Sequence, residues 1–299
     1  MSRILILCSL FVFSTVLEGF AGEEGYARPQ LLVEPADLAK PDSSGRRVVL
    51  DGRERKKFEE QHVPGARWVD AATWAKAFGD GKDIAAWSRR IGDLGIRADS
   101  TVVVYDDSMS RDAARIWWIL RYWGIDDARL LNGGWTGWKS GRLPVEAGSP
   151  KAPPPVDLTL KPRAERLATK DLVLETVKDH KFQIVDTRSE AEYCGREKHA
   201  KRAGAIPGAT HLEWIDVIEA KTQRFKGAAD LRKVLRDAGV DPDRPAITHC
   251  QSGARASVMV FAMELLGAKD VRNYYASWGE WGNADDTPIV TETSKASKK

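Results

Sequence analysis

Cysteine is scarce in this chain, with three among 299 residues, and only five histidines and four methionines are present. Three cysteines are too few for a small disulfide scaffold, and their wide spacing excludes a zinc knuckle. An excess of charge of one sign is also lacking, because 46 Lys and Arg face 43 Asp and Glu for a net charge of +3. This near balance argues against a nucleic-acid-binding protein. The 42% of hydrophobic residues indicates a globular chain with enough material for real cores.

An apolar run at the N-terminus predicts export. Met1–Arg3 carries one positive charge, and Ile4–Leu17 is a run of apolar and small residues that is too short to span a bilayer comfortably. Gly19 and Ala21 place small residues at the two positions that a signal peptidase recognises. We therefore expect residues 1–21 to be a cleaved signal peptide, with an uncleaved anchor as the alternative. The mature protein is then periplasmic, or alternatively secreted, without membrane insertion.

Internal similarity divides the rest of the chain into two halves with one plan. Four segments match in the same order in both halves, which indicates a tandem duplication. The matched pairs are residues 48–53 with 183–188, 62–66 with 205–209, 101–105 with 246–249, and 135–138 with 278–281.

Short runs of β-branched residues alternate with amphipathic segments in each half. The runs show no long polar alternation, which suits parallel strands buried on both faces. Helices are expected at Asp112–Trp123, Ala228–Ala238 and Arg255–Leu266. Strands alternating with helices predict an α/β fold in each half, a mainly parallel sheet flanked by helices.

Composition also predicts the domain limits. Residues 148–163 contain three consecutive prolines, which favour an extended linker. We therefore expect one domain at residues 30–147 and a second at 164–290, followed by a disordered polar tail at 291–299.

The segment that follows the strand at 246–249 carries the most informative chemistry. Cys250 lies between that strand and a predicted helix, and Gly253 permits dihedral angles that turn backbone N–H groups towards the sulfur. The positive N-terminus of the helix and the charge of Arg255 favour the thiolate, so we expect the pKa of Cys250 to lie below about 8.5. The alternative is a buried, inert cysteine. The predicted anion-binding loop comprises Gln251, Ser252, Gly253, Ala254 and Arg255.

The order of these motifs resembles the two-domain form of the rhodanese (thiosulfate sulfurtransferase) family. The motifs are Asp-x-Arg at 186–188, Ile-Pro-Gly-Ala at 206–209, Cys-x-x-Gly-x-Arg at 250–255 and Trp-x-x-Trp at 278–281, and the resemblance covers roughly residues 31–290. It implies two tandem rhodanese-like domains, an inactive first one and a catalytic second one. In the first domain an aspartate replaces Cys250. Strand position favours Asp106 as that aspartate, whereas an ungapped count back from Trp135 favours Asp107.

The resemblance implies a double-displacement mechanism that needs no metal or organic cofactor. Cys250 would take the outer sulfur of a small anionic donor such as thiosulfate and pass it, from a persulfide, to a thiophilic acceptor such as cyanide or a thiol. Arg255 is expected to orient the donor. Asp186 and Arg188 are expected either to form a salt bridge that fixes the loop or to contact the donor directly. Glu192 stands where some members have a further donor-binding Arg, which weakens the prediction of thiosulfate as donor.

The sequence of the loop allows three other interpretations. Cysteine-dependent phosphatases need five residues between Cys and Arg, whereas this loop has four, so the smaller ring favours sulfur. A 3-mercaptopyruvate sulfurtransferase is related, but its loop usually lacks the Arg and has the sequence Cys-Gly-Ser-Gly. A persulfide relay to a partner protein thiol outside the cytoplasm is the third alternative. Cys194, His211 and His249 are interpreted as incidental or structural.

Overall fold

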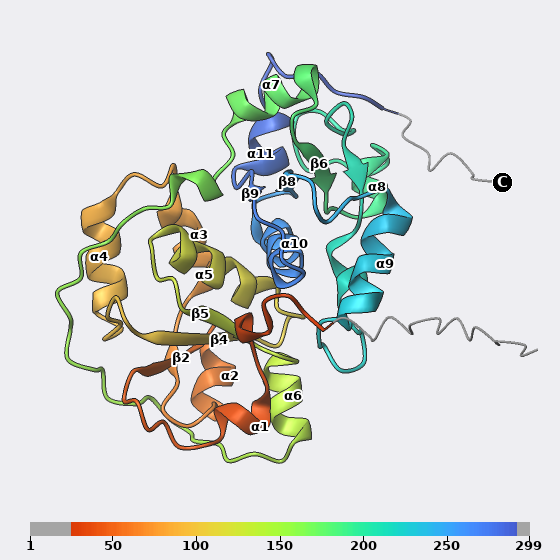
Figure 1. The fold of residues 1–299 in the computed structure, drawn as a ribbon. Helices are drawn as coiled ribbons and strands as arrows, with labels where there is room; N and C mark the ends of the chain where they lie inside the picture. Colours follow the sequence, from red (N-terminus) through yellow and green to blue (C-terminus); the bar gives the residue numbers. More distant parts are fainter. Residues whose placement is uncertain (1–24, 292–299) are drawn as a thin grey trace, which may run out of the picture.

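The computed structural model describes residues 25–291, so the predicted signal peptide and residues 292–299 of the predicted tail lie outside the described residues. One parallel sheet lies in each half (Figure 1). The first sheet has the order β1-β5-β4-β2-β3 and the second the order β7-β6-β8-β9. The strands are β1 (Leu32–Val33), β2 (Arg47–Asp51), β3 (Arg67–Trp68), β4 (Thr101–Tyr105), β5 (Ala128–Leu131), β6 (Gln183–Asp186), β7 (Thr210–His211), β8 (Ala246–His249) and β9 (Val271–Asn273).

Helices cover both faces of the first sheet (Figure 1). Successive strand residues point to opposite faces. Val102 and Val104 therefore pack with α3, α4 and α5, while Val103 and Tyr105 pack with α1, α2 and α6. The helices are α1 (Pro35–Leu38), α2 (Arg55–Glu60), α3 (Ala71–Phe78), α4 (Ile84–Gly92), α5 (Arg111–Tyr122) and α6 (Gly134–Ser140), preceded by a 3-10 turn, η1 (Pro29–Leu31).

The second sheet is covered in the same way. Val185 of β6 packs on the side of α9 and α10, and its neighbour Ile184 packs on the side of α7 and α11. The helices are α7 (Lys170–Asp179), α8 (Glu190–Tyr193), α9 (Ala228–Ala238), α10 (Ala254–Leu265) and α11 (Ser277–Trp281), with 3-10 turns η2 (Ala164–Arg166) and η3 (Trp214–Val217). The predicted α/β fold with a parallel sheet in each half is confirmed.

The two halves share one apolar core through α5 and α10. The Trp117 ring meets Phe261 edge to face at 4.9 Å between centroids, and Trp118 stacks on Tyr275 at 5.0 Å. Phe78 approaches the same tyrosine at 4.7 Å. Aromatic rings bury large areas, and pairs in these geometries add to the free energy of burial. The contact between the halves is therefore a packed core.

The predicted linker, residues 148–163, contains no helix or strand. It lies against the first half, because the Val156 N–H donates to the Gly92 carbonyl at 3.0 Å and the side chains of Leu158 and Leu160 are buried. The limits of the domains proposed from the sequence stay predictions.

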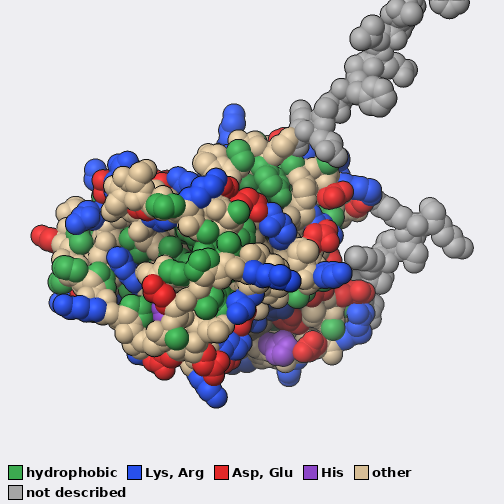
Figure 2. Space-filling view, turned by 90° about the horizontal axis from the view of Figure 1, so that it is seen from below, with side chains coloured by type: hydrophobic (Ala, Val, Ile, Leu, Met, Phe, Trp, Pro, Cys, Tyr) green, Lys and Arg blue, Asp and Glu red, His purple; other side chains and the backbone are tan. Residues whose placement is uncertain are grey.

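On the face shown in Figure 2, Lys and Arg side chains are interspersed with Asp and Glu, as the near balance of charge suggests. Among residues 25–291, no helix has the length and apolar character needed to cross a bilayer.

Candidate active site

Cys250 lies between the end of β8 and the start of α10, and its side chain is buried, with 1% of the residue exposed. The loop turns at Gly253, whose φ is +85°. A Cβ atom there would lie 2.6 Å from the Tyr275 ring. Glycine is therefore required both for the left-handed backbone and for the close approach of the tyrosine.

Backbone contacts with α11 fix the direction of the loop peptides. The Trp278 N–H donates to the Cys250 carbonyl at 3.0 Å, and the Gly279 N–H donates to the Gln251 carbonyl at 2.9 Å. With these carbonyls held on one side, the Gly253 N–H donates to Cys250 Sγ at 3.1 Å. This N–H dipole stabilises negative charge on the sulfur. Ser252 is exposed, whereas Ala254 is buried at the first position of α10.

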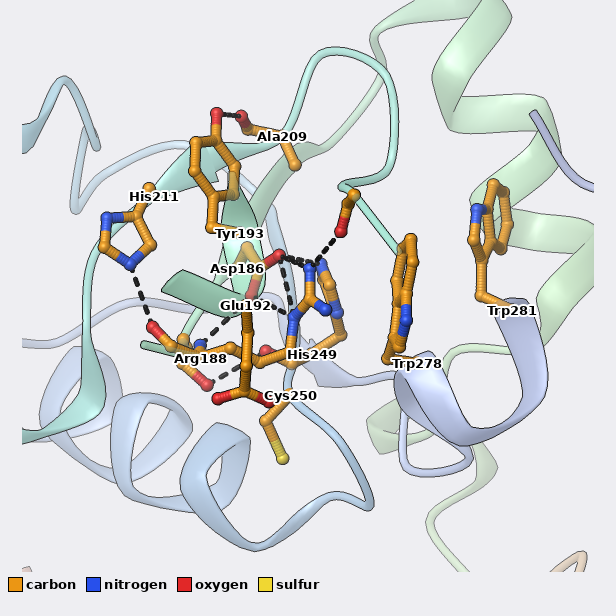
Figure 3. A network of polar contacts seen from close by, with 12 residues as sticks. Asp186, Arg188, Glu192, Tyr193, Ala209, His211, His249, Cys250, Trp278 and Trp281 are labelled. Atoms are coloured by element: carbon orange, nitrogen blue, oxygen red, sulfur yellow. Dashed lines mark hydrogen bonds and ion pairs between the residues drawn. The ribbon is translucent and has the colours of Figure 1, made fainter. Parts of the chain in front are cut away.

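A buried ion pair lies beneath the loop. Arg188 Nε donates to Asp186 Oδ1 at 3.0 Å and Nη2 to Oδ2 at 2.5 Å, and the guanidinium lies over the Trp278 ring at 4.2 Å. Arg188 is 1% exposed and also donates to the Gly204 carbonyl. Cys250 Sγ points away from this pair (Figure 3). Asp186 and Arg188 therefore form the expected salt bridge, while their influence on the loop or on a donor stays a prediction.

His249 is also buried against this ion pair, with Nε2 3.5 Å from Asp186 Oδ2. Burial lowers the pKa of His249 to about 4, against the opposing attraction of Asp186. The imidazole is therefore neutral at pH 7, and it contributes no positive charge beside Cys250. His211 has a structural contact as well, because its Nε2 lies 2.8 Å from the Arg188 carbonyl.

Arg255 forms a two-point ion pair with Glu192. Its Nη1 donates to Oε2 at 2.6 Å and its Nη2 to Oε1 at 2.9 Å. Burial opposes the charge of Arg255, but the hydrogen bonds to Glu192 and the charge of Cys250 outweigh it and raise the pKa of Arg255. Glu192 is held in turn by a capping box with Ser189 at the start of α8. Arg255 therefore lies beside the thiol with its charge matched by a carboxylate.

Comparison of the chain with known proteins shows the family to which it belongs. The rhodanese-like domain model matches residues 34–141 and again 169–284. The chain belongs to the rhodanese-like family. It is 33% identical to a thiosulfate sulfurtransferase of Pseudomonas aeruginosa, over 87% of this chain and 96% of that protein. It is also 33% identical to the sulfur carrier protein TtuD of Thermus thermophilus, over 89% and 98%. The crystal structure of SseA from Escherichia coli, described as a 3-mercaptopyruvate sulfotransferase, superposes with a TM-score of 0.73 at 24% identity, covering 83% and 98%.

The first rhodanese-like domain places Asp106 where the second has Cys250. Both residues directly follow their strand, and the Trp135 N–H donates to the Asp106 carbonyl at 2.8 Å, as Trp278 does for Cys250. The left-handed residue before the helix is Ser110 in the first domain, four positions after Asp106, whereas Gly253 is three positions after Cys250. The first loop is thus one residue longer, which explains why counting back from Trp135 pointed to Asp107.

Sequence reasoning missed two residues at the loop. Ser277 is buried at a φ of +56°, and its Oγ accepts from the Cys250 N–H at 3.1 Å. The sequence held one indication of this position. Gly134, the residue before the matched Trp135 in the first half, is the counterpart of Ser277 and also has a left-handed backbone. Arg115 of the first domain donates to Ser252 across the interface, a contact with no signal in the repeat. Within residues 25–291, no group of three or more His, Cys, Asp or Glu side chains is arranged to hold a metal ion.

Proposed function

We propose that this protein is a thiosulfate sulfurtransferase that acts through a persulfide on Cys250. The observation that carries the proposal is the loop that aims the Gly253 N–H at the Cys250 sulfur, with Arg255 alongside. Curated relatives from Pseudomonas aeruginosa and Azotobacter vinelandii that bear this activity support it, at 33% and 32% identity over most of this chain.

The chemistry is two displacements at one sulfur atom. The Cys250 thiolate attacks the outer sulfur of thiosulfate, the S–S bond of the donor breaks, and sulfite leaves with the electron pair. The new persulfide ends in a terminal sulfur that also carries negative charge, which the loop N–H dipole stabilises. A thiophilic acceptor such as cyanide then attacks that sulfur, forms thiocyanate and regenerates the thiolate. Each half-reaction uses the same loop, so ping-pong kinetics are expected.

Intact-mass spectrometry tests the proposal directly. Incubation with thiosulfate should add one sulfur atom to the protein, and cyanide should remove it. Cys250→Ser should take up no sulfur, whereas Cys194→Ser, the matched control at the other described cysteine, should behave as the parent does. A parent protein with free, reduced Cys250 that gains no sulfur contradicts the proposal. Sulfur uptake that persists in Cys250→Ser contradicts the assignment of the residue.

The ion pair between Glu192 and Arg255 favours a second candidate function, a persulfide relay to a protein thiol. A loop cation that is already matched by a carboxylate offers less attraction to a dianionic donor. The similarity to a protein named as a sulfur carrier supports the same idea. A very high Michaelis constant for thiosulfate together with fast transfer from a thiol persulfide identifies the relay, and a low constant argues against it.

We propose in addition that the protein acts after export, in the periplasm. The apolar N-terminal run and the small residues Gly19 and Ala21 support this. Expression of the full chain in a Gram-negative host should give a periplasmic protein whose first residue is Gly22. A full-length chain retained in the cytoplasm or in the membrane overturns the proposal.

A further inference from the structure

Arg115 belongs to α5 of the first domain but contacts the loop of the second. Its Nη2 donates to the Ser252 carbonyl at 2.9 Å and to the Ser252 Oγ at 3.2 Å. Its guanidinium lies 5.9 Å from the centre of the Tyr275 ring, which packs on Gly253. Arg115 is half-buried. It therefore lies at the outer rim of the loop that holds Cys250.

Within residues 25–291, the charge of Arg115 has no acidic partner. In the part of the chain that the structure describes, no Asp or Glu lies within ion-pair distance of its guanidinium. Its two hydrogen bonds go to neutral oxygens, a carbonyl and a hydroxyl. An anion that approaches the rim can take the place of the hydroxyl without breaking an ion pair. A guanidinium suits this task because its N–H groups form a fork that matches oxyanions.

The cation that belongs to the Cys250 loop itself is already paired. Both Nη atoms of Arg255 are used by Glu192. Glu213 is a further carboxylate close enough to interact with Arg255. Burial raises the pKa of Glu213, the charge of Arg255 lowers it and the charge of Glu192 raises it. On α5 itself, Arg111 also lies near enough to Arg255 to affect it, but its charge is matched by Asp112 at 3.1 Å. Arg115, whose charge is not matched by a carboxylate within residues 25–291, thus comes from the domain that lacks the cysteine.

We propose that Arg115 of the non-catalytic domain binds the anionic sulfur donor at the rim of the Cys250 loop and so determines specificity for anions. The inference rests on the proposed sulfur transfer. It assigns a task to the first domain: that domain supplies the charge that Glu192 has neutralised in the second. The donors that fit are small compounds with a sulfonate or carboxylate group next to the reactive sulfur, of which thiosulfate is one.

Steady-state kinetics with thiosulfate give the first test. Arg115→Gln should raise the half-saturating thiosulfate concentration about three- to tenfold, with a much smaller change in the turnover number, because a ground-state contact to the anion is lost. Arg115→Lys, which keeps the charge, should recover most of the loss. Arg111→Gln is the matched control, since it removes an already matched charge from the same helix, and it should change this concentration less than twofold. High salt should reduce the difference between parent and Arg115→Gln. An unchanged half-saturating concentration overturns the proposal.

Alkylation of Cys250 separates an electrostatic role from a structural one and does not depend on sulfur transfer. Iodoacetate and iodoacetamide both form a thioether with the thiolate and release iodide, but only iodoacetate is an anion. Arg115→Gln should lower the ratio of the iodoacetate rate to the iodoacetamide rate. Equal slowing by both reagents, or an unchanged ratio, shows that Arg115 only docks the domains and overturns the proposal. A parent that fails to take sulfur from thiosulfate defeats the proposed function, while the alkylation ratio still decides the role of Arg115.

Discussion

The two domains build the same loop around different acids. In the first, the buried Asp106 carboxylate accepts hydrogen bonds from the N–H groups of Ser108, Ser110, Asp112 and Ala113, at 2.8–3.1 Å, and from the Ser108 hydroxyl. Burial raises the pKa of Asp106 even against these donors. In the second, the Gly253 N–H donates to the Cys250 sulfur, and Arg255 lies beside it. The comparison teaches that an anion-binding loop filled by its own carboxylate is a structural element, whereas the second loop holds a cysteine sulfur in place of that carboxylate.

A second difference between the domains is which side of the ion pair beside each loop carries the positive charge. Lys57, at the third position of α2, donates to Asp107 of the first loop at 2.8 Å. Glu192, at the third position of α8, accepts from Arg255, which follows the second loop. In both domains an ion pair thus connects the helix to the loop. The basic residue lies on the helix in the first domain, whereas the acidic residue lies on the helix in the second. In the second domain, the basic residue lies on the side of Cys250.

Replacing Asp106 should produce the largest effect. Asp106→Ala leaves the buried N–H groups of Ser110 and Ala113 without an acceptor, together with two half-buried ones. Each unsatisfied buried donor costs about 1–3 kcal/mol, so we expect the free energy of unfolding to fall by about 3–5 kcal/mol. Cys250→Ala removes one N–H contact and should cost less than about 1.5 kcal/mol.

Urea unfolding of both variants measures this difference. Asp106→Asn, which keeps one acceptor oxygen, should lie between the parent and Asp106→Ala. If the alanine variants of Asp106 and Cys250 lose equal stability, the carboxylate is not what holds the first loop together, and the contrast drawn between the domains is wrong.

The second comparison concerns Tyr105 and His249, which end equivalent strands and face Asp51 and Asp186. The Tyr105 hydroxyl donates to Asp51, whereas His249 is buried and neutral with a pKa of about 4. Because an unfolded histidine titrates near pH 6.5, the unfolded chain binds more protons than the folded chain between pH 6.5 and 4. Stability should therefore fall as the pH falls through this window, by about 2 kcal/mol at pH 5 from this one group.

Urea titrations at pH 7, 6 and 5 check this prediction. His249→Tyr, which copies the first domain, should flatten the dependence, whereas His199→Gln, at an exposed histidine, should leave it unchanged. A parent and a His249→Tyr variant with the same slope between pH 6.5 and 5 contradict the assignment. Carboxylates with lowered pKa values, such as Asp186, contribute only at lower pH, because their unfolded values lie near 4.

Local patterns were enough to predict much of the fold. The strand at 101–105 and the helix at 228–238 coincide with β4 and α9, and the other two helices were placed within one residue of α5 and α10. The two-residue strands β1, β3 and β7 were not predicted, because two residues show no periodicity. Their pairing depends on neighbouring strands that the sequence alone does not align.

The sequence predicted those parts of the candidate site whose residues are close together in the chain. Cys250 and its loop are contiguous, so the local sequence predicts them. Asp186 and Arg188 were expected near the loop only because the resemblance to the rhodanese family implies it. Glu192 and Arg255 are 63 positions apart, and Arg115 and Ser252 are 137 apart. These contacts arise from the packing of α8 and α5 against the loop, which no spacing in the chain encodes.

Replacing Glu192 should produce the smallest effect, and it tests the role of the ion pair beside the second loop. Glu192→Gln removes the negative charge beside Arg255 but keeps the capping box, because glutamine at the third helical position can make the same contacts. Arg255 is then free to attract the donor, and the half-saturating thiosulfate concentration should fall about three- to fivefold, a gain of about 1 kcal/mol in binding. The matched control is Glu190→Gln on the same helix, whose exposed carboxylate pairs with Arg196 at 3.4 Å and should have no such effect. A rise in the half-saturating concentration in Glu192→Gln contradicts this prediction. It would mean that Glu192 positions Arg255 for the donor, so that the ion pair in the second domain aids donor binding.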